Sequence, residues 1–270
     1  MSINASQHNQ SSSNITEPTL SESFHQYFRI RVADTKKLRN CAFKIRYGVY
    51  CKELAWEPIR KSEVETDKYD DYSYHVLLEH IESKIFAGCV RIVIPPPHLP
   101  QALTPFEENC LFSVIPGQLN MKEYPKGSFG EISRIAVPCT FRRRPNEADH
   151  PYITAGISGK HVFTKEERRH FPNIAIGLYL SAVAMAEICQ HKAMFVMVEP
   201  RLCKHLRRAG LPFDQVGELI SYHGTRALFR LSANNYTSAM KLEVKELYDD
   251  IRESLRLQMT LLPYCDPTDR

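Results

Sequence analysis

The sequence lacks the short motifs that mark several large classes of protein. It contains no G-x-G-x-x-G stretch and no Walker phosphate loop, so the common nucleotide-binding folds are not expected. Its eight cysteines form no Cys-x-x-Cys pair, and no group of histidines and cysteines has the spacing of a zinc site. Scattered cysteines on apolar stretches are typical of reduced core thiols, so we predict no metal site.

Long hydrophobic runs are also missing. The longest, residues 174–189, is about four residues shorter than a membrane span and contains Glu187, which indicates a buried helix. The first 23 residues are rich in Ser, Asn and Gln and have no apolar core of the kind found in signal peptides. We therefore expect a disordered tail over residues 1–23, no transmembrane segment and a cytoplasmic location.

An excess of charge of one sign is absent too. The formal net charge of the 270 residues is only +4, and aromatic residues do not alternate with the basic clusters, so nucleic acid is not an expected partner. A hydrophobic content of 43% and a charged content of 24% are typical of a soluble globular domain with a full core.

The order of periodic segments predicts one mixed domain. It favours an α/β (α+β) class with a central, mostly antiparallel sheet flanked by helices. We predict strands at 28–32, 74–80, 84–94, 129–137, 193–199, 213–220 and 226–232, and helices at 34–56, 173–190, 200–209 and 238–257. The predicted division is a tail (1–23), a domain (24–232) that contains a polar insertion (141–172), and a C-terminal amphipathic helix with its tail (233–270).

Charged residues on apolar strands are the first functional signal. The stretch "GEISRIAV" (130–137) carries Glu131 and Arg134, whose side chains would face opposite ways in a regular strand. A β-bulge at Ser133 would bring both to one cleft. Arg91 lies within another apolar strand, where an unpaired guanidinium is rarely tolerated.

Two further groups could complete this polar constellation. Asp67 and Asp70 precede a strand and could supply counter-charges, while Arg46 and Tyr50 lie one turn apart on the first long helix. The residues leave two interpretations open. One is a structural ion-pair network at a sheet edge. The other is a polar cleft in which carboxylates hold an amine and arginines hold an acid group.

The ordered set of these residues resembles a known signature. Arg46-x3-Tyr50-x5-Trp56, Asp67-x2-Asp70, Gly88-Cys89-x-Arg91 and Glu131-x-Ser133-Arg134 are similar to the signature of acyl-homoserine-lactone (autoinducer) synthases. That family usually has Phe where this chain has Tyr50. The resemblance implies the GNAT (acyl-CoA N-acyltransferase-like) fold and transfer of an acyl chain from acyl carrier protein to the amine of S-adenosylmethionine.

The C-terminal half resembles a second group of enzymes. The stretches "HFPNIAIGLYLSAVAMA", "MVEPRLCKHLRRAGLPFDQVG" and "YHGTRALF" are similar to exosortase-associated (PEP-CTERM system) acyltransferases, which are akin to long-chain N-acyl amino acid synthases. This likeness runs from about residue 28 to 232 and accounts for the insertion at 141–172. His223 belongs to the "YHG" stretch and has no assigned role.

The two resemblances imply roles for the site residues. Glu131, desolvated on its strand, is the expected base for the attacking amine. Asp67 and Asp70 are expected to bind the ammonium or to orient the arginines, and Arg134 to organise Glu131 or to bind an acceptor carboxylate. The full predicted sets are catalytic Glu131, Arg134, Asp67, Asp70 and Arg46, and substrate-binding Arg91, Tyr50, Trp56, Ser133 and His223.

The donor is predicted from an absent loop. Many GNAT enzymes that use coenzyme A have a glycine-containing loop after the central strand, whereas this chain has "FRRRPNEADHP". The phosphopantetheine thioester of an acyl carrier protein is therefore the expected donor substrate, with no tightly bound cofactor. A basic docking patch for this acidic partner is predicted at Arg142, Arg143, Arg144, Arg201, Lys204 and Arg208, although a solvated helix face explains the last three equally well.

The sequence thus predicts an N-acyltransferase that moves a fatty acyl chain from acyl carrier protein to the amine of an amino acid or a similar small acceptor. An acyl-homoserine-lactone synthase that uses S-adenosylmethionine is the alternative. A further alternative is a non-catalytic GNAT-like module that binds acyl carrier protein and has a regulatory role.

Overall fold

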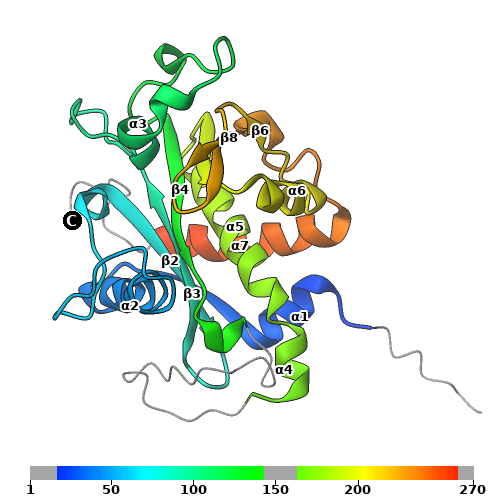
Figure 1. The fold of residues 1–270 in the computed structure, drawn as a ribbon. Helices are drawn as coiled ribbons and strands as arrows, with labels where there is room; N and C mark the ends of the chain where they lie inside the picture. The colour runs from blue at the N-terminus through cyan, green and yellow to red at the C-terminus, as the bar shows by residue number, and fades with distance from the viewer. Residues whose placement is uncertain (1–16, 143–162, 261–270) are drawn as a thin grey trace, which may run out of the picture.

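The computed structural model describes residues 17–142 and 163–260. A central sheet runs through the molecule, and helices lie on both of its sides (Figure 1). The strands in these ranges are β1 (Phe28–Val32), β2 (Ser73–His80), β3 (Phe86–Val93), β4 (Phe129–Ala136), β5 (Ala193–Val198), β6 (Asp214–Gln215), β7 (Ile220–Ser221) and β8 (Thr225–Ser232). The helices are α1 (Leu20–Tyr27), α2 (Lys36–Arg46), α3 (Pro105–Asn109), α4 (Lys165–Arg169), α5 (Pro172–Ile188), α6 (Pro200–Arg208) and α7 (Leu242–Thr260).

The strands follow the order β1-β2-β3-β4-β5-β8-β6, with β7 paired to β8. Within this sheet β4 and β5 run parallel, and the other pairs are antiparallel. The predicted mixed α/β (α+β) fold with a mostly antiparallel central sheet is confirmed. The strands predicted at 74–80 and 84–94 are present and form a hairpin, in which β2 pairs with β3 from Ser73 opposite Val93 to Glu79 opposite Phe86.

The two faces of the sheet carry different layers. Val76 and Val90 pack with α1, α5 and α7 in the main hydrophobic cluster. Leu77 and Cys89 point the other way, because side chains alternate along a strand, and they pack against α2. Helix α5 is apolar nearly all round, and its residues 177–186 are all buried between the sheet and α7. The face toward α2 is the one that carries the charged residues.

The first long helix is shorter than predicted. Instead of continuing to residue 56, α2 ends at Arg46 and the chain continues as a π-helical segment, η1 (Tyr47–Glu53). The N–H groups of Trp56 and Glu57 then both donate to the carbonyl of Tyr50, which ends the helical run. The wide π-turn places Tyr50 against β4, as described below.

The predicted boundary of the N-terminal tail at residue 23 is wrong. Helix α1 already begins at Leu20, because Thr19 and Glu22 form a capping box at its start. Phe24 of this helix is fully buried and packs on Gly177 of α5, where an added Cβ would come within 2.5 Å of the Phe24 ring. The chain is therefore part of the core four residues before position 24.

The C-terminal amphipathic helix belongs to the same core as the rest of the domain. Leu247, Tyr248, Ile251 and Leu255 of α7 are fully buried in the main hydrophobic cluster, beside α5 and α1. In the described ranges, no helix has both the length and the apolar character needed to cross a membrane.

The role of α7 in the core gives a direct test. Leu255→Ala should lower the free energy of unfolding by about 2–5 kcal/mol, because it leaves a cavity in a fully buried site. Leu257→Ala is the matched control two residues away, at a side chain that is 53% exposed, and it should change stability by less than about 0.5 kcal/mol. Urea unfolding followed by circular dichroism measures both. Equal effects would mean that α7 does not pack as described.

Candidate active site

Strand β4 contains the bulge that the sequence suggested, one residue later than predicted. Arg91 lies opposite Ser133 and Cys89 opposite Ala136, so β4 has one more residue than β3 between these two pairs. Arg134 follows Ser133 with a φ of +48°, a left-handed conformation that is rare outside glycine. The extra residue turns the Arg134 side chain to the face that also carries Glu131, Ser133 and Arg91.

Two arginines in this site have no access to water. Arg46 donates to Glu65 through Nε and makes a two-pronged contact with Asp70, at 2.6 and 3.1 Å. Arg91 donates to Ser133 Oγ at 2.9 Å, to Asp70 at 2.9 Å and to Asp67. Bidentate pairs of this kind fix the direction of the guanidinium as well as neutralising it.

The acidic segment 65–72 folds so that its carboxylates contact these arginines. The Asp67 side chain accepts from the N–H of Tyr69, and Asp70 accepts from the N–H of Asp67 at 2.8 Å, which forms a capping box on the short helix η2 (Lys68–Tyr72). Burial raises the pKa of Asp70, but the positive charges of Arg46 and Arg91 outweigh it and hold that pKa well below its usual range.

Arg134 is surrounded by three carboxylates. Its Nη2 lies 2.8 Å from Glu57, 3.2 Å from Glu65 and 3.5 Å from Asp67, and its guanidinium lies over the Tyr50 ring. The sequence analysis placed no role on Glu57 or Glu65. Glu65 is fully buried and bonds Arg46 and Arg134 together, so it connects α2 to the bulge of β4. The only sequence signal for it was its place at the start of the acidic loop 65–72.

Glu131 lies outside the ion pairs described above, and its pKa is shifted in the opposite direction from those of Glu65 and Asp70. It is 3% exposed, and its Oε2 accepts a hydrogen bond from the Phe106 N–H at 2.8 Å. Burial raises its pKa to about 8, with the Phe106 hydrogen bond and the charges of Arg91 and Arg134 opposing the rise. Glu131 is thus a carboxyl group that titrates near neutral pH.

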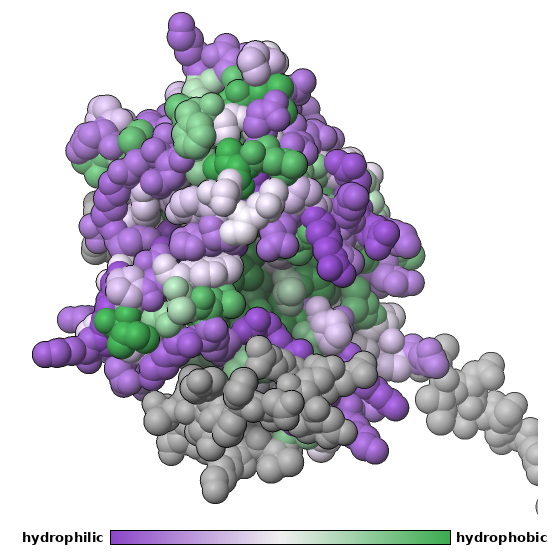
Figure 2. All heavy atoms as spheres, in the orientation of Figure 1, coloured by the Kyte–Doolittle hydropathy of each residue, from purple (hydrophilic) through white to green (hydrophobic). Residues whose placement is uncertain are grey.

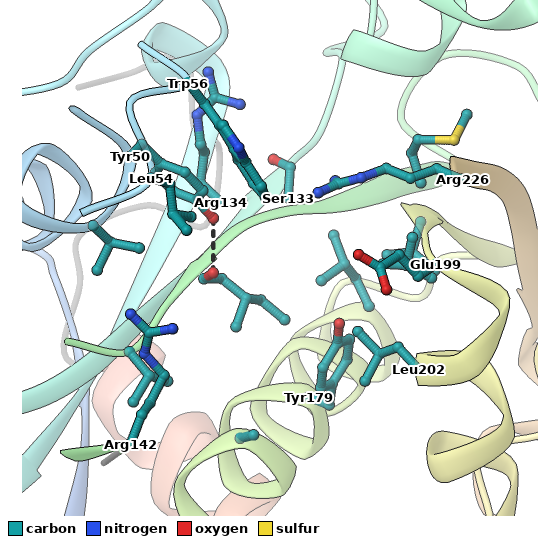
Figure 3. A pocket seen from close by; sticks show the side chains of 18 residues that line it. Tyr50, Leu54, Trp56, Ser133, Arg134, Arg142, Tyr179, Glu199, Leu202 and Arg226 are labelled. Atoms are coloured by element: carbon teal, nitrogen blue, oxygen red, sulfur yellow. Dashed lines mark hydrogen bonds between the residues drawn. The ribbon is translucent and has the colours of Figure 1, made fainter. Parts of the chain in front are cut away.

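An open cavity lies where β4 and β5 part. The two strands pair from Phe129 opposite Ala193 to Ile132 opposite Val196, and beyond Ile132 the pairing stops while both strands continue. A cavity of about 380 Å³ occupies this gap, lined by Ser133, Arg134 and Ile135 of β4 together with side chains of β5, α5 and η1 (Figure 3). In Figure 2, a recess with hydrophobic walls opens near the middle of the face shown.

Aromatic side chains form one wall of the cavity. The Tyr50 hydroxyl donates to the Ile135 carbonyl at 2.7 Å, which ties η1 to the unpaired part of β4 (Figure 3). Trp56 stacks with both Tyr50 and His223, with ring centroids 5.9 and 5.2 Å apart. Arg226 of β8, which the sequence analysis did not single out, lies 5.0 Å over the Trp56 ring.

The predicted docking residues fall near the other walls of the cavity. Arg142 lines it and pairs with Glu53, while Leu202 of α6 lines it from the opposite side (Figure 3). Arg201, Lys204 and Arg208 are exposed on α6. Hydrophilic side chains gather on this side of the recess in Figure 2. Arg143 and Arg144 lie outside the described residues.

Comparison with known proteins agrees with this geometry. Residues 45–148 match the family described as "Acetyltransferase (GNAT) domain". An acyl-homoserine-lactone synthase of Vibrio anguillarum is 24% identical over 201 residues, which are 74% of this chain and 85% of the relative. The chain is a GNAT-domain acyltransferase related to acyl-homoserine-lactone synthases.

Solved structures show the same fold at low identity. The crystal structure of TofI in a ternary complex with an inhibitor and MTA has a TM-score of 0.53 and 16% identity, over 80% of this chain and 96% of that one. The CoA-dependent acyl-homoserine lactone synthase MesI has a TM-score of 0.53 and 17% identity, over 82% and 95%. FeeM, an N-acyl amino acid synthase from uncultured soil microbes, has a TM-score of 0.51 and 15% identity, over 80% and 95%. An association with an exosortase system stays a prediction.

The predicted site residues of this acyltransferase divide into two groups. Tyr50, Trp56, Ser133 and Arg134 lie next to the cavity or along its wall, with His223 stacked behind Trp56. Arg46, Arg91, Asp67, Asp70 and Glu131 form the polar layer behind β4. In the part of the chain that the structure describes, no cluster of three or more His, Cys, Asp or Glu side chains is placed to hold a metal ion.

His75 is neutral and belongs to this polar layer. Burial lowers its pKa to about 3, against the opposing charge of Asp70, whose Oδ1 lies 3.5 Å from Nε2. A histidine with this pKa does not accept a proton near neutral pH. Glu131 is therefore the group in the layer that is suited to proton transfer.

Glu65 gives the sharpest test of the network. Glu65→Gln should lower the free energy of unfolding by about 3–5 kcal/mol, because it removes a carboxylate that neutralises two buried guanidiniums. Glu63→Gln is the control, since Glu63 is exposed and pairs with Lys52 at the surface. Chemical unfolding of the two variants measures the difference. A loss below 1 kcal/mol in Glu65→Gln would mean that the arginines do not depend on it.

Proposed function

We propose that this protein is an N-acyltransferase that moves a fatty acyl chain from a carrier thioester to the amine of an amino acid or a similar small acceptor. The observation that carries the proposal is the open edge of β4. Residues 133–136 are not paired with β5 and lie beside a cavity, shortly after Glu131, whose pKa burial raises to about 8.

The reaction forms an amide and releases a thiol. The amine nitrogen attacks the thioester carbonyl, the carbon–sulfur bond breaks, and the proton that the nitrogen loses reaches the leaving sulfur. An ammonium cannot attack, so a base must first take its proton. Glu131 is the proposed base, directly or through water. Backbone N–H groups of 133–136 that face the gap between β4 and β5 are the proposed donors to the developing oxyanion.

The charge of the polar layer favours a cationic acceptor. Three guanidiniums, of Arg46, Arg91 and Arg134, face four carboxylates, those of Glu57, Glu65, Asp67 and Asp70. One negative charge therefore remains while Glu131 is protonated. Of the four carboxylates, Glu57 and Asp67 are the more exposed, with 24% and 21% of their side-chain surface open to solvent, and they are the proposed ammonium contacts.

The buried arginines are assigned an indirect role. Arg46 and Arg91 are fully enclosed and contact carboxylates and Ser133 rather than the cavity. We assign both to positioning Asp67, Asp70 and the bulge. Ser133 holds Arg91 and has no catalytic base beside it, so its role is also structural.

A carrier-protein thioester is the proposed donor. The exposed basic residues of α6 lie next to a wall of the cavity and could receive an acidic carrier. Coenzyme A remains a second donor to test, because MesI, a structure with the same fold, is described as CoA-dependent. S-adenosylmethionine remains a second acceptor, because the Vibrio anguillarum relative is an acyl-homoserine-lactone synthase.

The deciding experiment is mass spectrometry of the products. The protein is incubated with C8–C18 acyl carrier proteins or the matching acyl-CoA thioesters and with a pool of amino acids and S-adenosylmethionine. We expect a long-chain N-acyl amino acid whose rate of formation rises with pH to about 8, because the active form of Glu131 is deprotonated. Glu131→Gln should reduce the rate by about 10²–10⁴-fold and remove this pH limb.

Thermal unfolding separates loss of the base from loss of the fold. Folded Glu131 keeps its proton up to about pH 8, because burial raises its pKa, whereas an unfolded glutamate has the ordinary pKa of 4.5, so wild-type stability should fall as the pH rises through this window. The expected slope is about 1.4 kcal/mol per pH unit relative to Glu131→Gln. A homoserine lactone product would give the alternative function. Carrier binding without any product would leave the non-catalytic module.

The proposed carrier surface has its own test. Arg201→Glu/Arg208→Glu on α6 should raise the KM for acyl carrier protein by about tenfold, with a weaker effect at high salt. Lys36→Glu/Lys37→Glu reverses the same number of exposed charges at the start of α2, on the other face of the sheet, and should leave this KM unchanged. Equal effects would identify a general charge effect rather than docking on α6.

A further inference from the structure

We infer that Arg226 binds the carboxylate of the acceptor, so that the acceptors of this site are amino acids rather than simple amines. The inference rests on the proposed function, because it names the part of the acceptor that the same site recognises. Arg134, which the sequence analysis considered for this role, is already faced by Glu57, Glu65 and Asp67.

Arg226 differs from the other arginines of the site in having no counter-charge among the described residues. Among the described residues, no carboxylate lies within 4.0 Å of its guanidinium, and its Nε is buried without a hydrogen-bond partner. Arg46, Arg91 and Arg134 each contact at least two carboxylates, and Arg142 pairs with Glu53. A partly buried, unpaired guanidinium is costly, and a bound anion would neutralise it.

The position of Arg226 fits the acceptor rather than the donor. It lines the cavity, and Figure 3 shows its side chain reaching across toward Ser133, away from the end of the cavity where Arg142 lies. The Arg226 guanidinium lies 5.0 Å over the Trp56 ring, which also stacks with Tyr50 and His223. A cation is attracted to the face of an indole, and the forked N–H groups of an arginine suit a two-pronged contact with a carboxylate.

The site offers separate partners for the ammonium and the carboxylate of an amino acid. Arg226 lines the cavity together with Ser133 and Arg134, which follow Glu131 on β4 by two and three residues. An acceptor in the cavity could direct its ammonium toward Glu131 and its carboxylate to Arg226. Glu199 also lines the cavity, but it is exposed and forms no ion pair with Arg226 in the described structure. It therefore leaves the guanidinium available.

The test compares acceptors that differ only in the carboxylate. Glycine, leucine and phenylalanine are each assayed against their carboxamides, with saturating acyl carrier protein. For the preferred side chain, wild type should favour the acid over the amide by at least about tenfold in kcat/KM, because a charge-assisted contact is lost in the amide. In Arg226→Gln this ratio should fall to about one through a higher KM for the acid, with the KM for the donor unchanged.

Two further variants guard the interpretation. Arg226→Lys keeps the charge but not the fork and should give an intermediate ratio, so the test still decides if Arg226→Gln unfolds. Arg230→Gln removes an arginine of the same strand that contacts Gln118 and Tyr124 instead of the cavity, and its ratio should match wild type.

Each outcome has one meaning. If wild type acylates acids and amides equally well, or if Arg226→Gln leaves the ratio unchanged, the inference is overturned while the proposed function stands. If Arg226→Gln raises the KM of the donor alone, its guanidinium serves the phosphate of the donor arm and the inference is again overturned. If wild type acylates no amine at all, the proposed function itself fails.

Discussion

The neutralisation of buried arginines at the β4 bulge is the constraint on which the site depends. Arg46 and Arg91 are enclosed between α2, β3 and β4, and an enclosed guanidinium is tolerated only with carboxylates in good geometry. Glu65, Asp67 and Asp70 supply them from one short segment between η1 and β2. Two of these carboxylates, Glu65 and Asp67, also hold Arg134, the residue whose left-handed backbone forms the bulge.

This network has a structural and a chemical consequence. Structurally, the bulge and the Tyr50 hydroxyl bond keep the end of β4 away from β5, so the gap between the strands stays open. Chemically, pairing in the network lowers the pKa of Asp70 and Glu65, whereas burial outside it raises the pKa of Glu131. Carboxyl groups of the same site thus have opposite protonation tendencies, which is the arrangement that separates an electrostatic role from a proton-transfer role.

Of the two interpretations that the sequence left open, the structure shows the ion-pair network, and binding of a substrate by the same residues stays a proposal. The charged residues are both an ion-pair network and the back of a cleft. Most of them are paired with one another. The groups proposed for a substrate are protonated Glu131 and Arg226, which have no ion pair among the described residues, and Glu57 and Asp67, which are paired but partly exposed. Charged residues on apolar strands mark the network in the sequence. Which of these groups are available to a substrate depends on their ion pairs in the folded structure.

The sequence by itself determined the elements and most members of the site. Apolar periodicity predicted the strands β2, β3 and β5 and the buried helix α5, since burial on one or both faces imposes that pattern. The isolated charges on β3 and β4 marked Arg91, Glu131 and Arg134. It also held an unused signal for α1, the capping box of Thr19 and Glu22. Tertiary structure alone decided the position of the bulge and the pairing of Glu65 and Glu57 with Arg134. It also decided that Arg226 has no paired carboxylate among the described residues. Those properties depend on which charges from distant segments meet in space, and nothing in local propensity encodes such meetings.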